Sequence, residues 1–181
     1  DTSEKNKFND PGIVKIDEQR FNYWRTHLLN SLSLQNPAYQ AEAIMAFSSM
    51  NDATPFKKIS ESFSTSESPQ VRAAAAFYLG RINGPNAMHI LLNAVQAEKD
   101  PAVKTQILLA LSKSISPPEV GAILHAVSDK NVEVREAGYL SFIQIAKRGI
   151  HNPSFVTLAI TALSSQTELL SVRWLASYTL S

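Results

Sequence analysis

Histidines are the side chains of this sequence best suited to bind a metal ion or to exchange protons near neutral pH. There are four, His27, His89, His125 and His151, and none belongs to a recognisable metal-binding motif. His89 and His125 fall at similar places in successive segments, and we interpret both as surface or packing residues. The chain has no cysteine, which excludes disulfides, thiol catalysis and cysteine-built zinc sites. The sequence therefore predicts no metal site.

Nucleophilic and phosphate-binding motifs are also missing. Serine is plentiful, but it does not occur in the Gly-x-Ser-x-Gly motif of hydrolases, and no glycine-rich nucleotide-binding pattern is present. Glu61 with Glu67, and Asp129 with Glu133, lie in polar turns and are interpreted as solvated carboxylates rather than an acid–base pair. We therefore expect a protein that is not an enzyme, with no catalytic residues and no cofactor.

Composition limits the alternatives further. Among 181 residues, 44% are hydrophobic, which is enough for a packed core and too much for a disordered chain. Seventeen Lys and Arg against sixteen Asp and Glu give a net charge of +1, so a general nucleic-acid binder is not expected. No apolar run reaches the roughly 18 residues of a membrane span.

Prolines mark where the secondary-structure elements begin. Seven of the nine follow a helix-capping residue or a glycine, and proline fits the first helical position because no N–H is needed there. These pairs are Asn36-Pro37, Thr54-Pro55, Ser68-Pro69, Gly84-Pro85, Asp100-Pro101, Ser116-Pro117 and Asn152-Pro153. Asn131 supplies one more cap without proline. The pattern predicts short helices of about a dozen residues joined by tight turns, and no segment alternates like a strand.

An internal repeat shows how these helices are organised. A valine followed by a basic residue recurs at intervals of 32, 31 and 38 residues. The four copies are Val71-Arg72, Val103-Lys104, Val134-Arg135 and Val172-Arg173, with Tyr39-Gln40 as a weaker fifth. The period predicts five helix pairs, at about 18–50, 51–82, 83–115, 116–148 and 149–181. The expected fold is an all-α, right-handed α-solenoid in which each pair buries its apolar face on its neighbours.

The segment from Ser68 to Ile82 resembles the second helix of HEAT-like repeats of the phycobilisome-lyase type. Asp100-Pro-Ala-Val-Lys and Asn131-Val-Glu-Val-Arg match its opening. The resemblance implies that Arg72, Arg135 and Arg173 bond an acid in the turn of a neighbouring repeat, with Asp100 as one such partner. It also implies that the second helices line the concave side of the solenoid.

The seventh residue of each second helix is apolar throughout, where the resembling repeats commonly have a polar residue. These residues are Met45, Phe77, Leu109, Leu140 and Tyr178. At 100° per residue this position lies about 240° from the starting valine, well away from the core positions. We expect a protein-binding stripe along the groove, extended by Trp174. Burial between adjacent second helices is the alternative, and a homodimer contact could use the same positions.

We therefore predict a non-catalytic protein-binding adaptor or assembly scaffold. An accessory subunit of a lyase-like modifying enzyme is the alternative, ahead of nucleic-acid binding. Trp24 is expected to cover the first repeat as an N-terminal cap. Residues 1–17 are interpreted as a flexible leader, ahead of a solenoid over 18–181. A polar start of this kind resembles a mature exported protein, so a periplasmic location is favoured over a cytoplasmic one.

Overall fold

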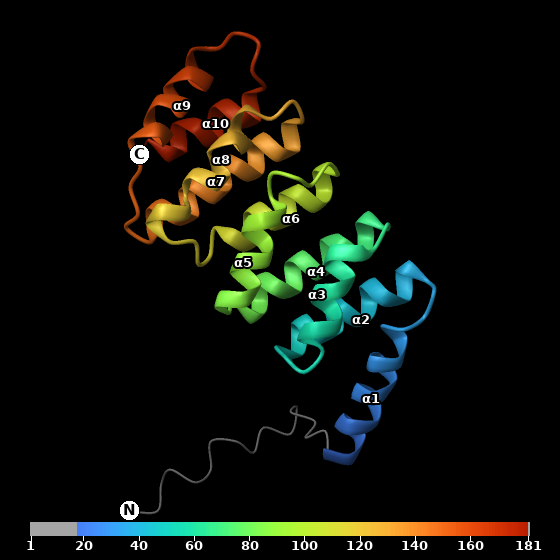
Figure 1. Cartoon of the computed structure of the whole chain (residues 1–181). Helices are drawn as coiled ribbons and strands as arrows, with labels where there is room; N and C mark the ends of the chain where they lie inside the picture. The colour runs from blue at the N-terminus through green and yellow to red at the C-terminus, as the bar shows by residue number, and fades with distance from the viewer. Residues whose placement is uncertain (1–17, 181) are drawn as a thin grey trace, which may run out of the picture.

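The structure is a computed structural model that describes residues 18–180. The prediction of a leader over residues 1–17 lies outside the described residues. Within residues 18–180 every regular element is a helix, and the helices form five consecutive pairs, as Figure 1 shows. The predicted all-α solenoid is confirmed, and so is the order of its helix pairs.

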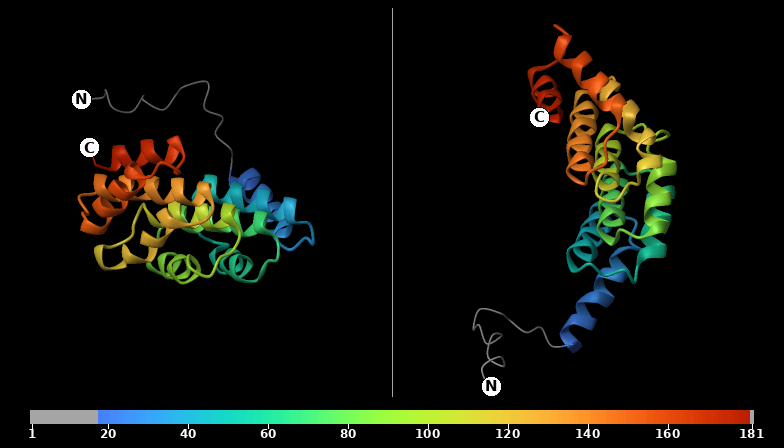
Figure 2. Two further views of the ribbon diagram at one scale, coloured as in Figure 1. Left: turned by 90° about the horizontal axis from the view of Figure 1, so that it is seen from above. Right: turned by 90° about the vertical axis from the view of Figure 1, so that its left-hand side faces the viewer.

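The first helices of the pairs form one layer and the second helices form another (Figure 2). The first helices are α1 (Glu18–Ser31), α3 (Phe56–Thr65), α5 (Pro85–Ala94), α7 (Gly121–Leu124) and α9 (Pro153–Ser164). The second helices are α2 (Pro37–Met50), α4 (Pro69–Ile82), α6 (Pro101–Leu111), α8 (Val132–Lys147) and α10 (Leu170–Thr179). Successive second helices pack directly on one another, and the first helices α1, α3, α5 and α9 pack mainly on second helices.

The first helices are spread apart, which makes their layer the outer side of a curve. An open hollow lies between α3 and α5, lined by residues such as Phe63 and Ile90. A smaller one follows α5, where Val95 faces Ala122. In the right-hand view of Figure 2 the stack bends as an arc, with α8 and α10 on its inner side. The second helices therefore line the inner face, as the resemblance implied.

Helix starts follow the predicted caps at most positions. The side-chain oxygens of Asn36, Asp100, Asn131 and Asn152 each accept a backbone N–H at the start of their helix. Such a bond satisfies one of the free donors of the first turn. Two helices end at an asparagine with left-handed backbone, Asn51 and Asn83, both at φ 52°. Asparagine tolerates this conformation better than most residues, which makes it a good helix stop.

Two of the predicted helix starts differ from the structure. Thr54 does not cap α3, which begins at Phe56 after Pro55. The Thr54 hydroxyl instead accepts a hydrogen bond from Arg25, and the Thr54 N–H donates to the Asp52 carboxylate. The first helix of the fourth pair is also broken, because the short α7 lies between two 3₁₀ segments, Pro117–Glu119 and His125–Ser128. Two prolines and Gly121 disfavour a continuous α-helix there.

The core runs along the whole stack between the two layers. The repeat valines Val71, Val103, Val134 and Val172 are all fully or almost fully buried. Close contact between second helices depends on a glycine of α4. A Cβ on Gly80 would lie only 2.5 Å from the Cβ of Ala110 on α6. The repeat register therefore fixes both the core and the spacing of the inner helices.

Candidate functional site

Ion pairs join each of three repeats to the next one along the inner helices. In each, the basic residue after the buried valine bonds a carboxylate in the turn before the following second helix. The pairs are Arg72–Glu98 at 3.0 Å, Lys104–Asp129 at 2.9 Å and Arg135–Glu168 at 2.8 Å. All six side chains are largely shielded from solvent. These residues therefore fasten the repeats together rather than bind a ligand.

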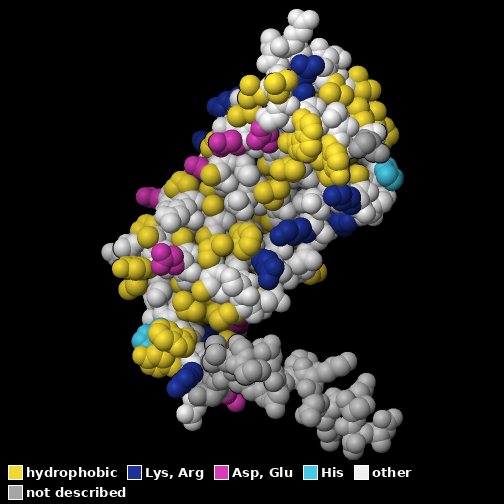
Figure 3. All heavy atoms as spheres, turned by 180° about the vertical axis from the view of Figure 1, so that it is seen from behind, with side chains coloured by type: hydrophobic (Ala, Val, Ile, Leu, Met, Phe, Trp, Pro, Cys, Tyr) yellow, Lys and Arg dark blue, Asp and Glu magenta, His cyan; other side chains and the backbone are white. Residues whose placement is uncertain are grey.

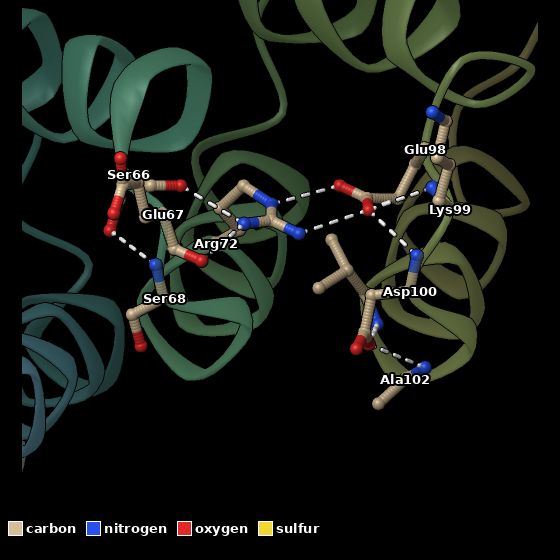
Figure 4. A network of polar contacts seen from close by, with 9 residues as sticks. Ser66, Glu67, Ser68, Arg72, Glu98, Lys99, Asp100 and Ala102 are labelled. Carbon is tan, nitrogen blue, oxygen red and sulfur yellow. Dashed lines mark hydrogen bonds and ion pairs between the residues drawn. The ribbon is translucent and has the colours of Figure 1, made fainter.

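The Arg72–Glu98 pair shows how each member also fixes its own turn (Figure 4). Arg72 Nη1 donates to the carbonyl oxygens of Ser66 and Glu67, both before α4. Glu98 Oε1 accepts the backbone N–H groups of Lys99 and Asp100. The acid is thus Glu98 and not the expected Asp100, because the Asp100 carboxylate is occupied with capping α6.

Electrostatics in these turns favour the ionised acids. Burial raises the pKa of Glu98, but hydrogen bonds from Arg72 and from the backbone of Asp100 and Lys99 outweigh it and leave the pKa lowered. The pKa of Asp129 and that of Glu168 are lowered in the same way. Hydrogen bonds to a charged carboxylate stabilise the charged form. The acids are therefore held in their anionic, bonded state at neutral pH.

The six residues of the predicted stripe lie on the inner helices, and none of them is buried. Met45 and Leu140 are each 41% exposed, Tyr178 is 50% exposed and Trp174 is 65% exposed. Phe77 and Leu109 are half-buried. Trp174 and Tyr178 stack on each other with ring centroids 5.9 Å apart. We call these six residues the inner stripe.

Two open hollows lie between neighbouring members of the inner stripe. One, of about 560 Å³, is lined by Met45 and Phe77 between α2 and α4. The other, of about 340 Å³, is lined by Leu109 and Leu140 between α6 and α8. Both hollows lie on second helices and therefore belong to the same face of the solenoid.

Charged side chains flank this face. Figure 3 shows apolar side chains spread along it, with Lys and Arg along one long edge and a mixture of Asp, Glu, Lys and Arg along the other. Arg81 and Lys113 are exposed near the C-terminal ends of their helices, and the Lys113 ammonium lies 5.6 Å from the Phe77 ring centroid. Glu42 lines the first hollow and Glu136 lines the second. Glu42, in the second turn of α2, and Glu136, in the second turn of α8, are the acidic residues beside the stripe that sequence reasoning missed.

A family model for HEAT repeats matches the chain twice, over residues 26–112 and 56–143. The chain belongs to the HEAT repeat family. These HEAT repeats end within α8 by the match, and the structure continues the same packing through α9 and α10. The match does not distinguish the phycobilisome-lyase type, which stays a prediction. No curated protein matches the chain.

The remaining candidate residues are not gathered into a site. Among residues 18–180 no group of three or more His, Asp or Glu side chains could hold a metal ion. In the same part of the chain no helix is long and apolar enough to cross a membrane. The prediction that Trp24 covers the first repeat is wrong, because its side chain is 62% exposed and contacts the ring of Tyr23. Helix α1, which carries Trp24, packs on α2 and reaches the core through the partly buried Leu28 and Leu29, and Trp24 is not part of that core.

Proposed function

We propose that this HEAT repeat protein is a non-catalytic adaptor or assembly scaffold that binds a protein partner along its inner face. The observation that carries the proposal is the inner stripe. Five successive repeats place an apolar residue at the same position of the second helix, and all of these side chains remain accessible. Contiguous exposed apolar surface of this kind marks interaction sites in soluble proteins.

The charges beside the stripe favour a protein partner over a nucleic acid. A phosphate backbone binds through a surplus of Lys and Arg, whereas here acidic side chains such as Glu42 and Glu136 lie beside the stripe as well as basic ones. Arg81 and Lys113 would meet acidic residues of the partner, and Glu42 and Glu136 would meet basic ones. An amphipathic helix with an apolar face between oppositely charged flanks suits this arrangement.

The test is capture of partners from native extract by three forms of the chain. They are the wild type, Phe77→Glu with Leu109→Glu, and a control with Ser64→Glu and Asn86→Glu. Both double variants add two negative charges, but the control residues are exposed on the outer helices α3 and α5. Circular dichroism establishes that all three are folded. We expect a partner that the control retains and the inner-stripe variant loses.

Equal capture by the two double variants would contradict the proposal and move the binding site away from the inner stripe. The alternative, an accessory subunit of a lyase-like modifying enzyme, has a different signature. In such a subunit the solenoid would hold a tetrapyrrole or a substrate protein. A bound tetrapyrrole would give the purified protein a visible absorbance band, which an adaptor without a prosthetic group does not have.

A further inference from the structure

The turns at the two ends of the inner helices differ in their acids. Every turn that leads into α4, α6, α8 or α10 contains an Asp or Glu, and three of these acids pair with a basic residue of the preceding repeat. The turns that follow α4, α6 and α8 contain neither residue type. These turns are residues 83–84, 112–116 and 148–152. The acids that neutralise cations within the fold therefore gather at one end of the inner helices.

Basic side chains lie at the end that lacks acids. Arg81 and Lys113 are both exposed and hold the same place, ten residues after the buried valine of their repeat. Lys147 is the last residue of α8, and Arg148 follows it. Within residues 18–180 none of these four side chains forms an ion pair. We call these four residues the basic edge, which follows the long edge of the inner face where Figure 3 shows Lys and Arg.

Two contacts place the basic edge beside the inner stripe and draw its charges together. The Lys113 ammonium lies 5.6 Å from the centroid of the Phe77 ring, which belongs to the preceding repeat. Arg148 donates to the carbonyl oxygens of Ser112 at 3.1 Å and of Ile115 at 3.0 Å. Its guanidinium therefore lies at the turn that contains Lys113. Because these bonds use neutral carbonyl groups, an anion that approaches this turn meets two cations without a counter-ion in the described part of the chain.

The side of the stripe opposite the basic edge is neutral in the central repeats. Gln70 lines the hollow beside Phe77, and Gln106 lines the hollow beside Leu109. The acids that line these hollows belong to α2 and α8. At α4 and α6 the charge beside the stripe is therefore positive, and a partner segment laid there gains from carrying acids.

The repeat also sets the spacing that a partner must match. Packed helices lie about 8–10 Å apart, and two turns of an α-helix, about seven residues, advance about 10.5 Å. A partner helix that lies along the stripe therefore presents one residue of a given heptad position to each repeat. Apolar residues about seven apart would meet Phe77 and Leu109 in turn. Acidic residues about seven apart would meet Arg81 and Lys113.

We propose that the occupant of the inner face is an acidic amphipathic helix, in which an apolar residue and an Asp or Glu each recur about every seven residues. This inference rests on the proposed function and adds the chemistry of the partner. The apolar residues of the helix cover Phe77 and Leu109. Its carboxylates bond Arg81 and Lys113. Cations near a helix C-terminus also stabilise that helix, so the test measures binding and stability separately.

The probe is a labelled synthetic helical peptide of about three heptads with Leu and Glu at the two recurring positions. A matched peptide has Lys in place of each Glu, and the receptor is the full chain. We expect the wild type to bind the Glu peptide about tenfold more tightly than the Lys peptide at low salt, with a smaller preference at high salt. In Arg81→Glu with Lys113→Glu, which we call the charge-reversed chain, the preference should reverse.

The control chain for this experiment is Lys57→Glu with Lys99→Glu. It makes the same change in net charge at two exposed positions outside the basic edge and should keep the wild-type preference. Circular dichroism and urea denaturation establish that both variants are folded and comparably stable. Equal binding of the two peptides by the wild type, or binding of neither, would overturn the proposal.

A second measurement uses the natural partner and separates this inference from the proposed function. Capture from native extract is repeated with the charge-reversed chain, the control chain and the inner-stripe variant. We expect only the control chain to retain the partner, and the sequence of the partner to contain a helical segment with acids at heptad spacing. A partner that the inner-stripe variant loses and the charge-reversed chain retains would overturn this inference and leave the proposed function standing.

The remaining outcomes of the capture are also decisive. A partner that both of these variants retain would overturn the proposed function together with this inference. Capture of a nuclease-sensitive nucleic acid, lost on charge reversal, would overturn the inference in favour of phosphate binding.

Discussion

Arg72 and Glu98 form a two-point ion pair that ties the start of α4 to the turn before α6. Arg72 Nε lies 3.0 Å from Glu98 Oε2, and Nη2 lies 3.1 Å from Oε1. The Arg72 guanidinium also donates hydrogen bonds to two carbonyl groups of the turn before α4. The Glu98 carboxylate accepts hydrogen bonds from two backbone N–H groups of the turn before α6. One contact therefore sets both the position of each turn and the register between successive repeats.

Replacing Arg72 by Met should destabilise the chain, because Glu98 and the carbonyls of Ser66 and Glu67 lose their donor. We expect the free energy of unfolding to fall by about 1–3 kcal/mol, measured by urea denaturation. Arg81→Met at an exposed position is the control and should change it by less than about 0.5 kcal/mol. An equal effect of the two substitutions would show that the ion pair does not couple the repeats.

Acid should destabilise the solenoid through the turn carboxylates. The hydrogen bond from Arg25 is the largest cause that lowers the pKa of Asp52, from an ordinary 3.8 to about 2, and burial opposes it. A lowered folded-state pKa gives stability that is present above the unfolded-state pKa and is lost as the pH falls through the folded-state pKa. The free energy of unfolding should therefore decline between about pH 4 and pH 2.

The contribution of Asp52 to this acid sensitivity can be isolated with Asp52→Asn. The variant should be less stable at neutral pH and should show a flatter decline over the same interval. Chemical denaturation of the wild type and the variant at a series of pH values measures how steeply each unfolding free energy falls with pH. Identical pH dependence in the wild type and in Asp52→Asn would mean that the Arg25–Asp52 pair does not cause the acid sensitivity.

Adding a methyl group at Gly80 should disrupt the contact between α4 and α6. The new Cβ would overlap the Cβ of Ala110 and approach its Cα at 3.0 Å, and backbone cannot move aside as a flexible side chain can. We expect Gly80→Ala to cost about 1–3 kcal/mol in unfolding free energy, despite the higher helix propensity of alanine. Gly121→Ala, with nothing within 4 Å of its added Cβ, is the matched control and should be neutral or stabilising. If the two variants are equally stable, the helices have room to separate.

Much of the fold is predictable because the same local signals recur in every repeat. Val71 and its equivalents predict the buried face, and Asn131 predicts a helix start even without proline. The identity of the acid opposite Arg72 is not predictable in this way. Glu98 and Asp100 are both acidic and only two residues apart, and the path of the turn decides which carboxylate caps α6 and which reaches Arg72.

The candidate surfaces depend still more on the three-dimensional arrangement. Leu79 and Leu180 are the same residue type at the same repeat position, yet one is buried and the other is 41% exposed. Within residues 18–180, α6 packs on the helix of Leu79, whereas no described helix follows Leu180. The sequence pattern identifies the repeat position, and the structure shows which copies of it are buried by neighbouring helices.

Trp174 should report directly on occupation of the C-terminal half of the inner face. The chain has two tryptophans, Trp24 and Trp174, and both are more than 60% exposed. In a Trp24→Phe variant the remaining fluorescence comes from Trp174, which should be readily quenched by acrylamide. Binding of a partner along the inner stripe should lower this quenching because the indole becomes covered.

The converse variant, Trp174→Phe, keeps only Trp24 at the other end of the solenoid and should show no such protection. Protection of Trp24 and Trp174 to the same degree would contradict binding at the inner stripe, since a nonspecific ligand covers exposed aromatic rings wherever they lie.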